Sequence, residues 1–333
     1  MNIFNRIILL AVAIVLIACN KADREPAKES KEVNVYTHRH YDTDKLLFKQ
    51  FEDETGIKVN VINANADELI TRMVNEGEQS PADVLITVDA GRLHYAKEKG
   101  LLQPIESEIL KKNVPTHLKD SENYWYGLTK RARLIVYSKD RVKDGDLKNY
   151  WDLTNQKYKG KVLVRASSNI YNQSLLASFI AHFPDSNYAE QWAKGIVNNM
   201  ARTPAGGDRD QVKAIAAGLG DLAIVNSYYI GKMIQSDDES ERNAVATISI
   251  LFPNQEDRGT HINVSGVGVA KYSKNKENAI KFIEYLTSKN AQGLFSDSNY
   301  EYPVNPEVDP SDLLKSWGTF KEDEINLSKL GEY

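Results

Sequence analysis

The sequence is poor in cysteine and carries no excess of positive charge. Its 333 residues include a single Cys, which excludes a disulfide framework and any zinc or iron–sulfur site built from cysteines. The formal net charge of −4 argues against a nucleic-acid partner, because such partners are bound mainly through basic surfaces. With 41% hydrophobic and 26% charged residues, the chain has the composition of a globular protein with a sizeable core.

The common signatures of hydrolases are also missing. The sequence contains neither the Gly-x-Ser-x-Gly motif of a nucleophile elbow nor the His-Glu-x-x-His motif of a zinc protease. Its scattered Ser and His residues show no spacing that indicates a catalytic triad. We therefore expect that the protein is not an enzyme, and a surface hydrolase is the weaker hypothesis.

The amino-terminal segment is typical of an export signal. Residues 1–18 combine an early Arg with a short apolar run, and this run is followed by Cys19. The run resembles the signal of bacterial lipoproteins, in which the chain is cut before the Cys and the thiol is lipidated. The alternative is a plain amino-terminal anchor. Residues 19–32 then form a polar tether, and no later stretch is apolar enough to span a bilayer. We expect a lipid-anchored protein in the periplasm or on an extracytoplasmic membrane face.

Strand-like and helix-like segments alternate along the rest of the chain. The predicted strands are 33–37, 57–62, 83–88, 161–165 and 221–225. The predicted helices are 42–54, 66–76, 91–99, 169–182 and 276–289. This alternation indicates an α/β fold with mostly parallel sheets flanked by helices, and the length favours two lobes.

Two segments are placed to carry the chain between these lobes. Residues 126–137 lead from the first lobe into the second, and residues 260–270 lead back. We assign 33–132 plus 257–305 to the first lobe. We assign 133–256 plus 306–333 to the second.

Phenol side chains recur where the predicted strands end. Such ends are where α/β sheets bind ligands. The residues that follow four of the strands are 37–41, Asp89, 167–171 and 226–229. Three of these four ends carry Tyr and the first adds His, and the chain as a whole has 17 Tyr against 9 Phe. Each Tyr by itself is better explained by aromatic packing, but their joint placement indicates one site.

A cluster of phenols and one imidazole suits a hard, highly charged cation. Free phenol has a pKa near 10, so a strongly charged ion must displace its proton. Zn²⁺ and Cu⁺ favour Cys or several His, and Ca²⁺ favours carboxylates. The formal charges of four phenolates and one Fe³⁺ ion sum to −1, and a nearby Arg could balance this charge. The alternative ligands are a polyamine, sulfate or an organic anion. A polyamine site needs carboxylates, and a sulfate site needs backbone N–H groups.

Four stretches resemble a known family. Residues 35–62, 80–93, 165–181 and 201–233 are similar to the ferric-ion-binding periplasmic proteins of bacterial iron ABC transporters. They are most like the cyanobacterial-type branch, which requires no accompanying anion. The resemblance runs from about residue 33 to about residue 305, and it implies the two-lobed type II periplasmic-binding-protein fold, with two crossover strands at the hinge.

The resemblance also implies a ligand set and a role. Carried over by position, the metal ligands are His40, Tyr41, Tyr171, Tyr228 and Tyr229. An octahedral ion would keep one position for water or a small anion. The implied cargo is Fe³⁺, captured between the lobes and delivered to an inner-membrane ABC permease with its ATPase. We expect a monomer with no nucleic-acid partner.

Some positions depart from the family or stand beside its motif. Another branch has Glu where this chain has Asp89, and we do not count Asp89 as a ligand. His38 precedes the matching His and is expected outside the metal's ligand set. Four arginines are candidates for balancing the charge of the site, namely Arg39, Arg131, Arg133 and Arg202, and Arg39 and Arg202 are favoured.

Overall fold

The fold is described from a computed structural model, which describes residues 31–333. The predicted signal peptide and Cys19 lie outside the described residues, and so do residues 20–30 of the predicted tether. None of the helices within 31–333 has both the length and the apolar character needed to cross a membrane.

One mixed sheet runs through the described residues. Its strands are β1 (Glu32–Thr37), β2 (Lys58–Asn63), β3 (Val84–Thr87), β4 (Leu102–Gln103), β5 (Tyr126–Ser138), β6 (Val162–Leu163), β7 (Leu222–Asn226), β8 (Ile248–Leu251), β9 (Ile262–Ala270) and β10 (Tyr302–Pro303). The main path of the sheet is β2-β1-β3-β9-β5-β7-β6. Strands β1, β2 and β3 are parallel, as are β6 and β7, whereas β5 and β9 are antiparallel to their neighbours.

Helices follow most of the strands. The α-helices are α2 (Asp42–Thr55), α3 (Ala66–Glu76), α4 (Ala90–Glu98), α5 (Glu108–Asn113), α6 (Ile170–His182), α7 (Tyr188–Asn199), α8 (Asp208–Ala216), α9 (Ser227–Ile234), α10 (Glu239–Ala246), α11 (Lys276–Leu286), α12 (Lys289–Asn299), α13 (Asp312–Ser316) and α14 (Lys329–Glu332). The predicted helix 276–289 is too long, because it ends at Leu286 and Ser288 caps the separate helix α12 by accepting the Ala291 N–H.

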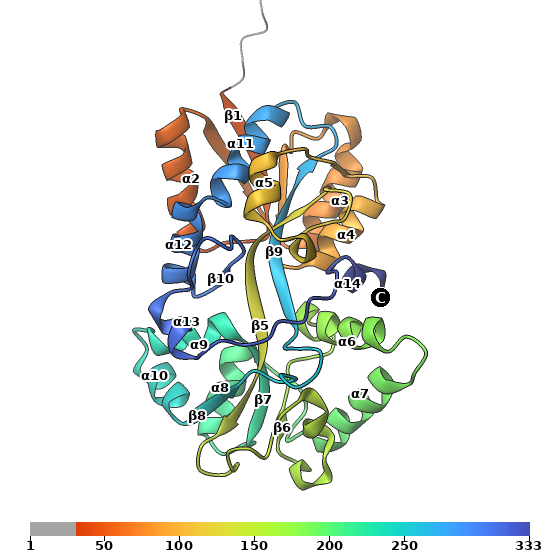
Figure 1. The fold of residues 1–333 in the computed structure, drawn as a ribbon, viewed down its shortest axis with the longest axis vertical. Coiled ribbons are helices and arrows are strands. Elements are labelled where there is room, and N and C mark those ends of the chain that lie inside the picture. Colours follow the sequence, from red (N-terminus) through yellow and green to blue (C-terminus); the bar gives the residue numbers. More distant parts are fainter. Residues whose placement is uncertain (1–30) are drawn as a thin grey trace, which may run out of the picture. The chain divides into compact units, whose positions relative to one another are not determined.

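Strands β5 and β9 connect the two halves of the sheet, as the sequence predicted. The first part of β5, up to Ala132, pairs with β9, and the second part, from Arg133, pairs with β7 and β8. In Figure 1 both strands run through the middle of the molecule, between β1 and α11 above and β7 and α8 below. These are the only two long strands of the described sheet that could serve as crossovers.

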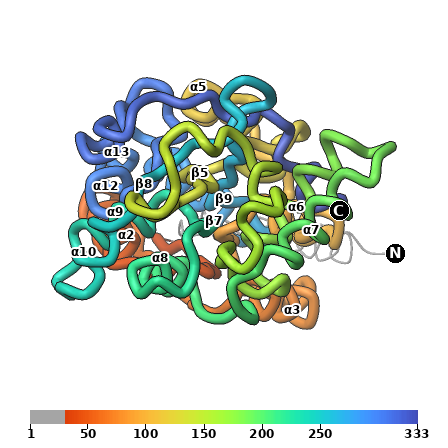
Figure 2. The backbone as a smooth tube through the Cα atoms, turned by 90° about the horizontal axis from the view of Figure 1, so that it is seen from below, coloured from red at the N-terminus to blue at the C-terminus, as the bar shows by residue number. Residues whose placement is uncertain are grey.

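The hydrophobic residues form one core in the first half and two in the second. The first core packs α2, α3 and α11 against β1, β3 and β9, and we call these elements the first lobe. In the second half, alternate residues of β5 face opposite sides: Leu134 and Val136 enter one core, and Ile135 enters the other. Figure 2 shows α8, α9 and α10 on one side of β7 and α6 and α7 on the other, and we call these elements the second lobe.

The carboxyl-terminal segment joins both lobes. Leu314 belongs to a core of the second lobe, whereas Leu327 and Leu330 belong to the first core. Helix α14 packs against α4 of the first lobe and α6 of the second. The sequence-based assignment of 306–333 to the second lobe did not foresee these first-lobe contacts.

Candidate metal centre

The predicted site residues stand at the amino-terminal ends of three helices. His40 and Tyr41 occupy the turn between β1 and α2, where the Tyr41 N–H donates to Asp44 at 3.3 Å. Tyr171 lies in the first turn of α6, and its N–H donates to the capping Asn169 side chain at 3.1 Å. Tyr228 and Tyr229 open α9, directly after β7. This end of a helix is the positive end of its dipole, which favours negative charge on a nearby ligand.

The structure brings the four tyrosines together around Tyr228. The hydroxyl oxygens of Tyr171 and Tyr228 are 3.2 Å apart. The Tyr228 ring lies 6.4 Å from the Tyr41 ring and 4.2 Å from the Tyr229 ring, measured between centroids. We call these four residues the tyrosine cluster. Tyr41 comes from the first lobe and the other three from the second, so the cluster spans both lobes.

His40 lies at the edge of this cluster. Its ring stacks on Tyr41 with a centroid distance of 5.3 Å, and its side chain is exposed. The Nδ1 atom is 3.4 Å from the His38 carbonyl oxygen. His38 itself is half-buried, and burial lowers the pKa of its imidazole.

Three phenols of the cluster have a raised pKa. Burial, followed by repulsion from Glu301 and Tyr171, raises the pKa of Tyr41. Burial and the neighbouring Tyr229 raise the pKa of Tyr171 to about 12. Burial and the adjacent phenols also raise the pKa of Tyr228 well above its ordinary value. A metal that binds these oxygens as phenolates must therefore displace their protons.

Arg39 lies beneath Tyr41 and fixes the turn that carries it. Its Cζ atom is 4.9 Å from the Tyr41 ring centroid. The buried guanidinium donates to Asp44 at 3.0 Å, to Glu301 at 2.9 Å and to Ser265 of β9 at 2.8 Å. Its charge is already opposed by two carboxylates, so Arg39 anchors the turn to the crossover strand and supplies no free positive charge.

The Arg202 guanidinium donates to the Gln211 side chain at 3.4 Å, and within residues 31–333 it forms no hydrogen bond or cation–π contact with the tyrosine cluster. Lys232 takes a place that the sequence reasoning did not assign. Its Nζ atom lies 3.8 Å from the Tyr41 ring centroid, and burial lowers its pKa to about 8. Lys232 follows Tyr228 by four residues, a helical spacing that could have revealed it.

Asp89 is buried, and hydrogen bonds occupy its carboxylate. One oxygen accepts from the Arg92 N–H at 3.2 Å, which caps α4. The other accepts from Ser174 of α6 at 2.6 Å and from Asn263 of β9 at 2.7 Å. These bonds connect the first lobe, a crossover strand and the helix that carries Tyr171. Asp89 therefore links these three parts of the fold through its hydrogen bonds.

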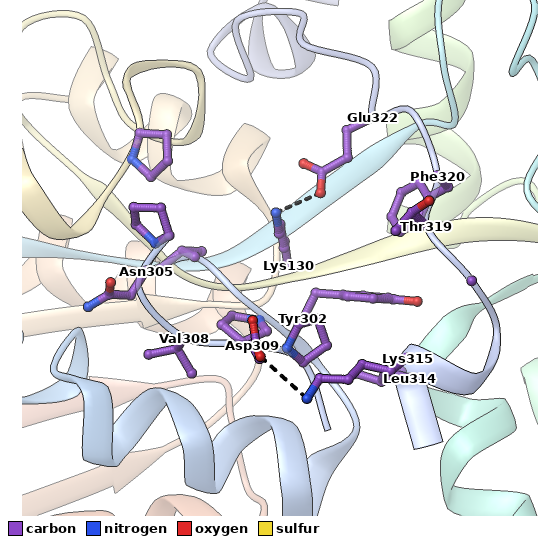
Figure 3. A pocket seen from close by; sticks show the side chains of 16 residues that line it. Lys130, Tyr302, Asn305, Val308, Asp309, Leu314, Lys315, Thr319, Phe320 and Glu322 are labelled. Atoms are coloured by element: carbon purple, nitrogen blue, oxygen red, sulfur yellow. Dashed lines mark hydrogen bonds and ion pairs between the residues drawn. The ribbon is translucent and has the colours of Figure 1, made fainter. Parts of the chain in front are cut away.

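A separate cavity of about 560 Å³ lies beside β5 and β10 and is a weaker candidate (Figure 3). Its charged groups neutralise one another: Lys130 pairs with Glu322 at 2.6 Å, and Lys315 pairs with Asp309 at 3.4 Å. No member of the tyrosine cluster lines it. This cavity consequently presents no unpaired charge with which to select an ion.

The chain matches a family of transport proteins over most of its length. Residues 79–320 match the family described as bacterial extracellular solute-binding protein. The iron uptake protein A1 of Synechocystis is 49% identical over 304 residues, which cover 91% of this chain and 84% of that protein.

Solved structures agree with this match. A Trichodesmium protein solved with iron and citrate has a TM-score of 0.87 and 49% identity, and the match covers 90% of this chain and 95% of the other. The ferric binding protein of Campylobacter jejuni has a TM-score of 0.85 and 44% identity, with coverages of 90% and 95%.

These likenesses confirm the predicted two-lobed, type II periplasmic-binding-protein fold and the predicted resemblance to ferric-ion-binding receptors. The chain belongs to the bacterial extracellular solute-binding proteins.

Proposed function

We propose that this protein captures Fe³⁺ between its lobes and that His40 and the tyrosine cluster are the ligands. The observation that carries the proposal is the assembly of four phenol groups from two lobes around Tyr228, with an imidazole at the edge. Related proteins named for iron uptake and ferric binding support it.

The donor set favours Fe³⁺ over other ions. Phenolate oxygen is a hard, anionic ligand. Because the pKa of these phenols is raised, only a highly charged ion binds strongly enough to compensate for the free energy of removing their protons. The described residues contain no group of three or more His, Cys, Asp and Glu suited to a metal ion. A softer or less charged ion would thus find fewer of its preferred ligands here.

Capture would use the connection between the lobes. Tyr171, Tyr228 and Tyr229 stand on the second lobe, and Tyr41 with His40 stands on the first. Iron that first meets the second-lobe phenols gains its remaining ligands only when the lobes close about β5 and β9. Closure is then driven by metal–ligand bonds that exist in the closed form alone. An external one-electron reductant that converts Fe³⁺ to Fe²⁺, which phenolates hold less well, would help release.

The role in transport is also part of the proposal. We propose delivery of the ion to an inner-membrane ABC permease with its ATPase, by a monomer that acts outside the cytoplasm and is anchored through a lipid on Cys19. A relative named as a probable ABC transporter periplasmic-binding protein supports the transporter part. We propose a receptor that binds and releases its cargo unchanged, in place of an enzyme.

An iron titration tests the proposal. Ferric citrate is added to the wild type, to Tyr229→Phe and to Tyr95→Phe, whose phenol is 44% exposed and outside the cluster. After desalting, visible absorbance and metal content are measured. We expect one iron per chain and a phenolate-to-iron charge-transfer colour in the wild type and Tyr95→Phe, and a loss of both in Tyr229→Phe. A colourless, iron-free wild type would overturn the proposal and favour an organic-anion receptor.

A further inference from the structure

The carboxyl-terminal residues 320–332, which we call the strap, pair with the chain just before it enters crossover strand β9. Thr260 forms a parallel bridge with Glu322, closed by two backbone hydrogen bonds of 2.9 Å. A Cβ atom on Gly259 would lie 2.5 Å from the Glu322 carbonyl oxygen, and Gly259 has a φ of +91°, so this close pairing requires glycine. The Glu322 carboxylate also pairs with Lys130 of β5 at 2.6 Å. The strap is therefore fixed to both crossover strands at the hinge.

Asp323 connects the strap to the second lobe. Its buried carboxylate lies 2.8 Å from the Nε2 atom of His182, the last residue of α6, and it accepts a hydrogen bond from Arg258 at 3.0 Å. Arg258 donates as well to Ser178 of α6, at 3.1 Å. The carboxyl end of α6 is thus tied to the strap directly and through a shared guanidinium.

The far end of the strap belongs to the first lobe. Leu327 and Leu330 are buried in the first core. A Cβ atom on Gly331 would lie 2.7 Å from the His94 side chain of α4 and 2.9 Å from the Gly91 carbonyl oxygen. Helix α14 therefore rests directly on α4, and glycine at residue 331 is what permits this close approach.

The same helix meets α6 of the second lobe. In Figure 1 α14 lies between α4 and α6, and it packs against both. Ala177 of α6 joins the first core, which also contains Leu330. Beside this contact, α4, α6 and α14 enclose a cavity of about 370 Å³ lined by Ile170, Ala177, Leu330 and Gly331, among others. The contact between α14 and α6 is thus incompletely filled, which suits two surfaces that must separate and meet again.

We propose that the strap is a latch that stabilises the closed arrangement of the lobes. Helix α14 is fixed to the first lobe and α6 belongs to the second, so a rotation of the lobes about β5 and β9 must separate the two helices. The free energy of their contact favours the closed form whether or not an ion is bound. The inference extends the proposed function, on which only its iron-release readout rests.

The test compares Gly331→Ala with a matched control, Gly293→Ala. The first substitution pushes α14 away from α4, whereas a Cβ atom on Gly293 of α12 meets no described atom within 4 Å. Small-angle X-ray scattering gives the radius of gyration of each metal-free protein, and transfer to a chelator gives the rate of iron release. We expect Gly331→Ala to have a larger radius and to release iron about 10-fold faster, and Gly293→Ala to match the wild type.

A second pair of variants tests the attachment at the hinge. Asp323→Asn removes the carboxylate charge that faces His182 and Arg258, and its control is Glu324→Gln, which alters the exposed carboxylate next to it. We expect Asp323→Asn to change the radius and the release rate in the same direction as Gly331→Ala. Glu324→Gln should leave both unchanged.

Iron loading separates lobe opening from local unfolding. Metal–ligand bonds should close every variant, so the radii of the loaded proteins should agree. A loaded Gly331→Ala that stays larger than the wild type, an unchanged radius in the metal-free variant, or an equal change in Gly293→Ala would overturn the inference. A wild type that takes up no coloured iron overturns the proposed function itself, and the radii of the metal-free proteins then still decide whether the strap is a latch.

Discussion

Iron binding should release protons, and the number follows from the protonation of the cluster. Tyr41, Tyr171 and Tyr228 each have a raised pKa and are therefore protonated at pH 7 to 8. If each binds Fe³⁺ as a phenolate, at least three protons leave per ion. The apparent affinity should then rise by about 1,000-fold per pH unit, which corresponds to about 4 kcal/mol at about 1.36 kcal/mol per proton and unit.

Two assays measure this number independently. Base uptake in a pH-stat during loading with ferric citrate counts protons directly, after the uptake by ferric citrate alone is subtracted. Competition with citrate at pH 7.0, 7.5 and 8.0 gives the slope of the affinity. Tyr95→Phe, which lies outside the cluster, should release the same number of protons as the wild type. A release near one proton per iron would refute the reasoning, because most of the phenols would then bind without ionising.

Three further perturbations test other parts of the structure. Burial lowers the pKa of Lys232 to about 8, so between pH 8 and 10 this side chain binds more protons in the unfolded chain than in the folded one, and its own contribution to the free energy of unfolding of the metal-free protein should rise by up to roughly 3 kcal/mol. Lys232→Met should remove this rise in urea denaturation. Arg39→Met should lower the free energy of unfolding by about 3–5 kcal/mol, against less than about 0.5 kcal/mol for Lys49→Met at an exposed pair; equal losses would contradict the proposed anchor. Ser174→Ala removes a cross-lobe hydrogen bond and should speed iron release to a chelator by about 10-fold or more, whereas Ser178→Ala on the same helix should not.

Much of the fold could be predicted because it depends on local patterns. The predicted strand 83–88 appears as Val84–Thr87, and the predicted helix 66–76 appears as Ala66–Glu76. Apolar periodicity and capping residues act over a few neighbouring positions, so they can be identified in the sequence. The end of α11 at Leu286 was placed three residues too late, and the Ser288 cap marks where the separate helix α12 begins.

The segment after residue 305 shows where local patterns fail. Its assignment to one lobe rested on chain order, which does not determine contacts between distant residues. In the structure Leu314 and Leu330 enter different cores, because the segment passes across both lobes before it ends beside α4 and α6. Burial of these leucines depends on which surfaces the fold leaves uncovered.

The sequence by itself determined which residue types follow which strands, and hence that phenols and an imidazole would gather at one edge of the sheet. Only the tertiary structure decided which charges accompany them. Arg39, Arg131 and Arg202 look alike in the sequence, yet the first is paired with two carboxylates, the second donates to the Val88 carbonyl oxygen, and the third donates to the Gln211 side chain. The reason is physical: a charge is balanced by whatever lies within a few ångströms of it, and those neighbours come from distant parts of the chain.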